Sequence, residues 1–368
     1  MRTMESAFSD PEICLGLLRR IRSELSAPMR FMELCGTHTA AVYRSGLHSL
    51  LPETLTHLSG PGCPVCVTHD REIAACLQLA GKDGISLACF GDMMRIPGPG
   101  GMSLGKAGAE GADVEVVYSP LDALRLAAER LDRTVVFLGI GFETTAPASA
   151  ATVLRAAEQG VNNFALFSMH KLVPPSIEAL LADGNSGGID AFLLPGHVSA
   201  VLGTAPYRFI AEKYGKPGVI AGFEPADILL SLLLLIRMRE EGRADVLNSY
   251  GRAVSDEGNA RARALADSVF KPVDALWRGL GLIPRSGWAL REEYARYDAR
   301  ARFVPDLPEV PENPACRCGD MLRGRIAPHD CPLFGKKCTP TAPAGPCMVS
   351  AEGSCAAAFR YGVAGRDE

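Results

Sequence analysis

The sequence predicts an α/β fold in which two small α/β domains with parallel sheets face a cleft, followed by a third domain of mostly helical or irregular structure. Short β-rich runs alternate with helical runs from residue 30 to about residue 242, which is the pattern of βαβ units. The chain has 368 residues, of which 47% are hydrophobic, so it can form two or three domains with ordinary cores. The remaining third lacks this alternation and ends in a segment rich in cysteine, glycine and proline.

The alternating region contains eight short runs that are rich in apolar and β-branched residues. We expect strands at residues 30–34, 54–59, 85–90, 114–118, 134–140, 164–168, 191–194 and 219–221. Helices are expected at residues 69–79, 119–131, 146–158, 176–182, 200–214 and 226–241. Residues 228–236 are almost entirely apolar, but this run is far shorter than the ~20 residues that a membrane helix needs. We therefore expect a buried helix there and no membrane span.

Each half of the alternating region carries its own polar loops directly after strands, which predicts one domain at residues 28–132 and another at residues 133–242. In open α/β sheets ligands bind at the carboxyl ends of the strands, so these loops mark the expected functional edge. Residues 243–300 are polar with a helical pattern, and a proline-rich connector then leads into the cysteine-rich tail. The expected third domain spans residues 243–368 and includes an N-terminal helix within residues 1–27.

Composition excludes several classes of protein. The net charge is −4 and basic residues are scattered, so the chain lacks the clustered lysine and arginine of a nucleic-acid binder. The N-terminal residues lack the charged and apolar regions of a secretory signal, which predicts a cytoplasmic protein. In that reducing compartment structural disulfides are rare, and clustered cysteines more often indicate metal or redox chemistry.

The tail is the strongest indication of such chemistry, because the last 53 residues hold six of the twelve cysteines. They are Cys316, Cys318, Cys331, Cys338, Cys347 and Cys355. Zinc sites usually present C-x₂₋₄-C pairs, and the tail has none. Wide, irregular spacing suits an iron–sulfur cubane, whose four thiolates can come from distant loops. A zinc-bound tail is the alternative that spacing leaves open.

Two further cysteine motifs follow predicted strands. Cys63 and Cys66 form a CxxC before a predicted helix, where the helix N-terminus stabilises a thiolate, so we interpret them as a redox pair. Cys35 is followed by Gly36, Thr37 and His38, which predicts an exposed, activated thiolate at a helix N-terminus with a histidine beside it as a base or second ligand. A merely buried Cys35 is the alternative, since free cysteine is among the most buried residue types.

In the second half of the alternating region, carboxyl, hydroxyl and imidazole side chains also come directly after predicted strands. Glu143 and Thr144 follow one predicted strand, and His197 follows another. We include Glu143 and Thr144 in the candidate catalytic set. The alternative for Thr144 and its neighbour Thr145 is simple capping of the next helix.

Together these motifs resemble the HypD family of [NiFe]-hydrogenase maturation factors. The resemblance rests on ELCGTHT, GPGCPVC, GFETTAP, PGHVSA, GFEP and the tail pattern CRCGDMLRG…CPLFGKKC…PCMVSAEGSC, and it extends over roughly residues 31–361. It implies two α/β domains across a cleft and a third domain that binds a [4Fe–4S] cluster. It also implies that the protein, with a HypC-type chaperone, carries the transient iron of an Fe(CN)₂CO unit. A HypE-type protein, loaded by a HypF-type carbamoyltransferase, would donate the cyanide.

The resemblance also implies roles for individual cysteines. Cys35 would anchor the iron, and Cys63 and Cys66 would be the redox pair. The cluster ligands would be Cys316, Cys331, Cys338 and Cys355. Cys318 and Cys347 would then form a second dithiol, and we expect electrons to pass from the cluster through both dithiols to the iron. The alternative function is an iron–sulfur-fed reductase that acts on a protein disulfide and has no iron-carrying role.

Overall fold

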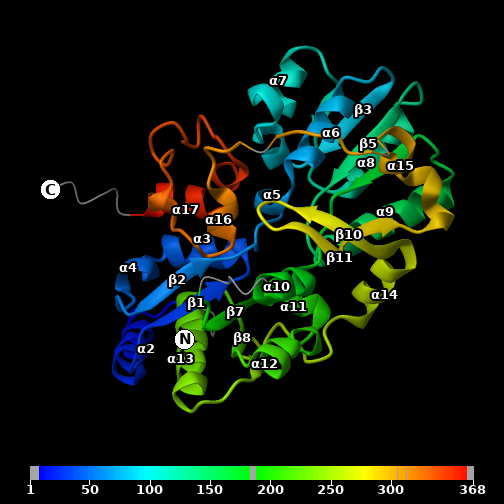
Figure 1. Cartoon of the computed structure of the whole chain (residues 1–368). Coiled ribbons are helices and arrows are strands. Elements are labelled where there is room, and N and C mark those ends of the chain that lie inside the picture. Colours follow the sequence, from blue (N-terminus) through cyan, green and yellow to red (C-terminus); the bar gives the residue numbers. More distant parts are fainter. Residues whose placement is uncertain (1–7, 183–187, 305, 312, 363–368) are drawn as a thin grey trace.

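The fold class is confirmed: two parallel sheets carry helices on their faces, and a hairpin and an irregular tail complete the molecule (Figure 1). The computed structural model describes residues 8–182, 188–304, 306–311 and 313–362. Residues 1–7 and 363–368 of the expected third domain, with Pro305 of the connector, lie outside the described residues.

All eight expected strands are present, and a ninth joins them. One sheet has the order β2-β1-β7-β8-β9, formed by β1 (Met29–Glu33), β2 (Leu55–Ser59), β7 (Ala191–Pro195), β8 (Gly218–Ala221) and β9 (Val246–Asn248). The other has the order β4-β3-β5-β6, formed by β3 (Ile85–Cys89), β4 (Val114–Val116), β5 (Thr134–Gly139) and β6 (Phe164–Ser168). Every pairing within these two sheets is parallel.

The two sheets do not follow the predicted division at residues 28–132 and 133–242. The chain leaves the first sheet after β2, builds the whole second sheet, and returns when β7 pairs with β1, opposing Phe31 to Ala191. Parallel strands need only a long crossover between them, so an entire second sheet can be inserted there. Local sequence patterns report strands but not their partners, which is why the insertion was not predicted.

The helices are α2 (Pro11–Glu24), α3 (Gly36–Arg44), α4 (Leu47–Leu50), α5 (Pro64–Val67), α6 (Asp70–Ala80), α7 (Leu104–Ala109), α8 (Pro120–Glu129), α9 (Ala146–Gln159), α10 (Val173–Ala182), α11 (Gly196–Leu202), α12 (Phe209–Tyr214), α13 (Pro225–Glu240), α14 (Ala260–Val269), α15 (Ala299–Phe303), α16 (Cys318–Leu322) and α17 (Ser354–Tyr361). The helix expected at residues 200–214 is interrupted between α11 and α12, because Gly203 adopts a φ of +77° that ends α11.

The apolar helix α13 is buried against the first sheet, as expected, with Ile228, Leu232 and Ile236 fully covered. Within the described ranges, no helix has the length and apolar character needed to cross a membrane. The N-terminal helix α2 packs on α13 in the first sheet's core. Its predicted inclusion in the third domain therefore does not match its packing, since its apolar face is covered by a different part of the chain.

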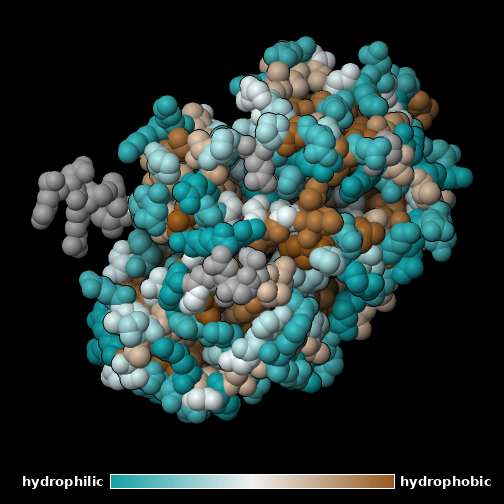
Figure 2. Space-filling model, in the orientation of Figure 1, coloured by the Kyte–Doolittle hydropathy of each residue, from teal (hydrophilic) through white to brown (hydrophobic). Residues whose placement is uncertain are grey.

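The expectation of helical structure throughout residues 243–300 is wrong in part. After α14 the chain forms an antiparallel hairpin of β10 (Phe270–Trp277) and β11 (Gly281–Leu290). The buried Trp277 at its end donates a hydrogen bond from Nε1 to Ser286 Oγ at 2.8 Å. The hairpin runs through the middle of the molecule, between the two sheets (Figure 1). Figure 2 shows apolar residues gathered there on an otherwise largely hydrophilic face.

A buried ion pair ties helix α6 to the segment after β6. Lys171 Nζ lies 2.6 Å from Glu72 Oε1, and the two side chains are 2% and 4% exposed. Removing one member of such a pair leaves an uncompensated charge inside the protein. Lys171→Met should therefore lower the free energy of unfolding by about 3–5 kcal/mol in urea denaturation.

Lys213→Met is the matched control, because the Lys213–Glu178 pair is largely exposed. It should change stability by less than about 1 kcal/mol. Adding Glu72→Gln to Lys171→Met should recover part of the loss, because the orphaned charge is removed. Equal effects of the two lysine variants would contradict the importance of the buried pair.

Candidate functional site

The site is built where β1 and β2 end side by side. These strands pair in parallel from Met29 opposite Leu55 to Glu33 opposite Ser59, so the loops that follow them emerge at one sheet edge. The Gly60 N–H donates to the carbonyl of Glu33, and the Gly36 N–H donates to the carbonyl of Gly62, each at 2.8 Å. The two cysteine motifs are thereby joined through their backbones.

The junction of the two loops leaves no space for a side chain at position 62, so only glycine fits there. A Cβ atom on Gly62 would lie 2.2 Å from the backbone nitrogen of Cys35, which no side chain can occupy. The CxxC loop therefore crosses directly over the start of the CGTH loop. The expectation that Cys35 and the Cys63/Cys66 pair share one edge agrees with this geometry.

Cys35 occupies the N-cap of α3, as the motif predicted, but it is buried, with 7% of the residue exposed. Burial, together with the nearby carboxyl groups of Glu352 and Glu33, raises the pKa of its thiol to about 12. The hydrogen bonds from the backbone of His38 and Thr37 only partly oppose this rise. The expectation of an exposed, activated thiolate is thus wrong, because desolvation outweighs the helix terminus.

Two carboxyl groups, the buried Glu33 and the half-buried Glu352, lie near Cys35. Glu33 Oε2 accepts the Cys35 N–H at 2.9 Å, and Glu33 is fully buried. Glu352, from the cysteine-rich tail, accepts a 2.7 Å hydrogen bond from Thr37 Oγ1. A Cβ on Gly36 would lie 2.5 Å from Cβ of Glu352, so the tail packs directly against the CGTH loop. This contact brings the tail to the first cysteine site.

His38 lies on α3, fully buried, with its Nε2 2.9 Å from the carbonyl oxygen of Gly222. Because a carbonyl only accepts, Nε2 carries the proton, and Nδ1 has no partner among the described residues. Burial lowers the pKa of His38 to about 4, so the ring is neutral. The Phe223 ring lies between His38 and His197, with ring centroids 4.6 and 4.0 Å away.

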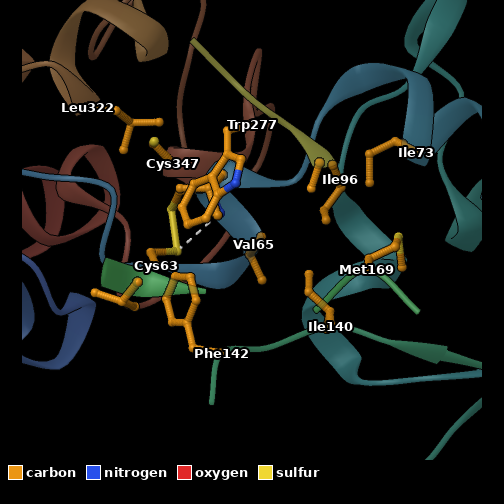
Figure 3. Close-up of a cluster of buried hydrophobic side chains, with 14 of the residues drawn as sticks. Cys63, Val65, Ile73, Ile96, Ile140, Phe142, Met169, Trp277, Leu322 and Cys347 are labelled. Atoms are coloured by element: carbon orange, nitrogen blue, oxygen red, sulfur yellow. Dashed lines mark hydrogen bonds between the residues drawn. A yellow bond between two sulfur atoms is a disulfide. The ribbon is translucent and has the colours of Figure 1, made fainter. Parts of the chain in front are cut away.

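Cys63 and Cys66 form a disulfide, with their Cα atoms 5.2 Å apart. Cys63 caps α5, and its sulfur accepts the Cys66 N–H at 3.2 Å. Trp277 and Cys347 lie beside this disulfide within one apolar cluster, as Figure 3 shows. The turn that carries Cys347, Pro346–Met348, contacts α5 directly. The Cys63–Cys66 pair thus lies next to Cys347, which is one member of the proposed second dithiol.

The tail thiols gather in one region. Burial raises the pKa of the Cys355 thiol, and ionisation of Cys318, Cys338, Cys316 or Cys331 raises it further, so each of these four thiols lies near Cys355. Within the described residues no group of three or more His, Cys, Asp or Glu side chains is arranged tightly enough to hold a metal ion. Cysteine thiolates are the ligands that hold an iron–sulfur cluster, so the tail cysteines fit such a cluster in their chemistry. In this structure they are free thiols whose side chains do not converge on one point.

Cys318 and Cys347 interact as a pair. Their mutual hydrogen bond lowers the pKa of Cys318 and raises that of Cys347. Arg278 also favours the Cys318 thiolate by its charge. This guanidinium is buried and held by two hydrogen bonds to Asp70, at 2.8 and 2.6 Å.

The GFETT loop contributes one buried group and one exposed group. Glu143 is buried, and its Oε1 accepts the Val173 N–H at 2.9 Å. Burial raises the pKa of Glu143 to about 7. Thr144 is exposed, so it does not share this buried environment. Thr145, at the N-cap of α9, makes no side-chain capping bond; its hydroxyl instead donates to the carbonyl of Phe142 at 3.1 Å.

A pocket of about 550 Å³ separates the loop edges of the two sheets. It is lined by Pro64 and Val65 of the CxxC segment, by residues 90–93 and Arg95 after β3, and by Ile140, Gly141 and Thr145 after β5. Residues 350–352 of the tail form a third side. The predicted cleft between sheets is therefore present, and the tail lines it.

Comparison with known proteins assigns this sequence to one family. The family model described as "HypD: Hydrogenase formation hypA family" matches residues 12–362. The chain belongs to the HypD family. It is 48% identical over 363 residues to hydrogenase maturation factor HypD2 of Bradyrhizobium diazoefficiens, with 96% of each chain covered. It is also 47% identical over 364 residues to HypD of Rhizobium leguminosarum bv. viciae, covering 96% of this chain and 94% of the relative.

A third relative, hydrogenase maturation factor HypD of Escherichia coli, is 45% identical over 362 residues, with 96% of each chain covered. These matches confirm the resemblance that the ordered motifs indicated. The chain is thus a member of a hydrogenase maturation family.

Several residues of this HypD-family site were not predicted. Glu33 and Glu352 lie inside the quoted motifs, and a glutamate at the end of a buried strand was an available signal for the first. Tyr207 and Trp277 lie outside the motifs, in segments that read as ordinary helix or polar chain. Only tertiary packing brings these two to the site.

Glu143 should make stability depend on pH. Its pKa rises from 4.5 in the unfolded chain to about 7 in the folded protein, so the folded state holds the proton more tightly. The contribution of Glu143 to the free energy of unfolding is therefore fully present below pH 4.5. It is lost as the pH rises through about 7, by up to about 3 kcal/mol. Urea denaturation at several pH values should show this loss in the natural chain and not in Glu143→Gln.

The difference between the two proteins isolates Glu143, because other titrating groups are common to both. Parallel pH curves for the two would contradict the buried, protonated state of this carboxyl group.

Proposed function

We propose that this chain is a maturation factor for [NiFe]-hydrogenase and holds the iron on which two cyanides and one carbon monoxide are assembled. The observation that carries the proposal is the junction of Cys35 with the Cys63–Cys66 pair, covered by Glu352 of the tail. A thiol for binding a metal and a dithiol for supplying electrons lie on adjacent strand ends. Membership of the HypD family supports the same function.

The iron is the substrate, and Cys35 is the residue that binds it. A soft thiolate suits Fe(II) that carries strong-field ligands. The buried thiol keeps its proton while no metal is present, since its pKa is about 12. Binding of the cation replaces that proton, and the positive charge offsets the nearby carboxylates of Glu33 and Glu352. A small HypC-type chaperone would supply a second thiolate from across the pocket.

Cyanide transfer from a HypE-type thiocyanate consumes two electrons. The reduced Cys63/Cys66 dithiol supplies these two electrons and two protons and becomes the disulfide. The donor's S–C bond breaks, its sulfur takes one proton and becomes a thiol, and cyanide goes to the iron while the second proton is released. The thiolate at the N-cap of α5 begins this chemistry, because a helix terminus favours the ionised sulfur.

The disulfide is then reduced again by thiol–disulfide exchange with Cys318 and Cys347. One dithiol and one disulfide exchange states, so electrons and protons balance. The direct packing of the Cys347 turn on α5 supports this exchange. A [4Fe–4S] cluster, when bound by Cys316, Cys331, Cys338 and Cys355, would supply single electrons to the tail dithiol.

Cys35→Ser should keep the fold but abolish iron binding, because a hydroxyl is a poor ligand for this iron. Infrared spectroscopy of the anaerobically purified complex with its chaperone should then lose the cyanide and carbon monoxide bands. Cys89→Ser is the matched control, since Cys89 is equally buried but lies in β3. Bands retained in Cys35→Ser would overturn the assignment of the iron ligand.

The Cys63→Ala, Cys66→Ala double variant tests the redox step. The activity of hydrogenase matured in cells should fall by roughly tenfold or more, because cyanide transfer from the donor to the iron then lacks its two electrons. Cys14→Ala, a half-buried cysteine of α2, serves as the control. Normal maturation by the double variant would contradict the dithiol role. Maturation that needs the pair but tolerates Cys35→Ser would instead favour the reductase alternative.

A further inference from the structure

Aromatic and basic side chains form one surface on the cysteine-rich tail, which lies at one edge of the molecule (Figure 1). Three rings form a continuous row: the centroid of the Phe334 ring lies 4.8 Å from that of His329 and 6.1 Å from that of Phe359. Phe359 is 43% exposed, and Tyr361 on the same helix is 37% exposed. Exposed apolar residues that adjoin one another mark interaction sites, whereas single ones are ordinary.

The row is built on segments that carry proposed cluster ligands. The N–H of Phe334 donates to the carbonyl of Cys331 at 3.0 Å, and the same residue pairs with Cys338 in a single β-bridge. Phe359 lies on α17 four residues after Cys355, and positions i and i+4 share one helix face. The α17 helix also packs against the turn that carries the histidine of the row. Any molecule that covers these rings therefore comes close to three of the four proposed ligands.

Three exposed cations border the row. They are Lys336, Lys337 and Arg360, of which the two lysines follow the central phenylalanine in a tight turn. Within the described residues the ion pairs of the tail involve other arginines and Asp320, so these three charges have no carboxylate partner. The segments that carry the row, residues 328–338 and 354–361, contain one acidic residue, Asp330. The surface is thus positively charged, although the net charge of the chain is −4.

These features favour a partner protein that delivers electrons. The proposed cycle takes two electrons from the tail dithiol for each cyanide, so an external reductant must restore that dithiol. Complexes that transfer electrons bury little surface, so a short row of rings with charged neighbours is large enough. Opposite charge steers such a partner to the surface. An anionic membrane would also attract rings and cations, but it would not account for their position on the ligand-bearing segments.

We propose that this surface docks a small acidic protein that carries a one-electron iron–sulfur centre and reduces the tail. The tail surface, as we name it, consists of His329, Phe334, Lys336, Lys337, Phe359 and Arg360. This inference rests on the proposed function and names the class of its electron donor. Each carrier gives up one electron. Two reduced carriers and two protons convert the disulfide of Cys318 and Cys347 into the dithiol, and both carriers leave oxidised.

The central test is binding of an acidic [2Fe–2S] ferredoxin to the full chain, purified anaerobically with its cluster, by isothermal titration calorimetry at low salt. The Lys336→Glu, Lys337→Glu variant should bind at least about tenfold more weakly, because two attractive charges become repulsive. The affinity of the natural chain should also fall as salt is added. The matched control is Lys213→Glu, Lys216→Glu, which changes the net charge equally but lies on and just after α12.

Unchanged binding by the tail variant, or an equal loss in both variants, would overturn the inference, because the tail surface would then not determine affinity. Failure of the natural chain to bind ferredoxin would overturn it as well. Binding of phosphatidylserine-containing vesicles in place of ferredoxin would instead assign the surface to a membrane.

Phe359→Ala tests the rings without changing the charge. The affinity for ferredoxin should fall about three- to tenfold while its dependence on salt stays the same, because a buried aromatic anchor contributes contact and not attraction at a distance. Leu131→Ala is the control, since Leu131 is 81% exposed and lies just after α8. An equal loss in these two variants would count against the row of rings.

Delivery of electrons provides a second readout. Reduced ferredoxin below saturation should generate two thiols for each oxidised tail pair, at least about tenfold more slowly in the lysine variant of the tail. Dithionite needs no docking, so it should reduce both proteins at the same rate and thereby show that the variant is folded. Equal rates with ferredoxin would overturn the inference while the infrared bands of the proposed function remain. Absence of those bands beside normal ferredoxin binding would overturn the proposed function alone.

Discussion

The contact between the backbones of Gly62 and Cys35 is the constraint on which the rest of this site depends. It exists because β1 and β2 pair in parallel and because Gly62 has no Cβ to hold the two loops apart. The same principle recurs at Gly36, whose missing side chain lets Glu352 of the tail approach. Gly62 therefore joins segments 27 residues apart in the chain, and Gly36 joins segments 316 residues apart.

Close packing also determines the chemical state of the site. Water is excluded from Cys35 and His38, and desolvation leaves both groups neutral at neutral pH, while Glu143, with a pKa of about 7, is protonated in only about half of the molecules. A neutral thiol and a neutral imidazole are inert until a cation arrives. Burial therefore keeps the thiol unreactive until a metal binds, which suits the proposed role in holding iron.

The local signals in the sequence were reliable wherever a residue's role depends on its near neighbours. All eight expected strands formed, and Cys35 lies at a helix N-terminus as its motif indicated, whereas Cys63 caps the short helix α5, which lies before the helix that was predicted to follow the CxxC. The hairpin β10–β11 was missed because Trp277 owes its position to contacts with the CxxC segment and Phe142, not to its own neighbours. Tyr207 was missed for the same reason: the groups that shift its pKa, Glu143, Ser199 and Cys35, come from three separate elements.

By itself the sequence determined the α/β class, the strands, the cysteine motifs and the family, because these follow from periodicity and from residues at fixed spacing. The cysteine-rich tail was also evident as a thiol-bearing unit. Tertiary structure alone decided that β7 returns to β1 around an inserted sheet, that the tail covers Cys35 and that the thiol is buried. Strand partners, desolvation and unpartnered atoms are properties of groups distant in the chain, so no local pattern encodes them.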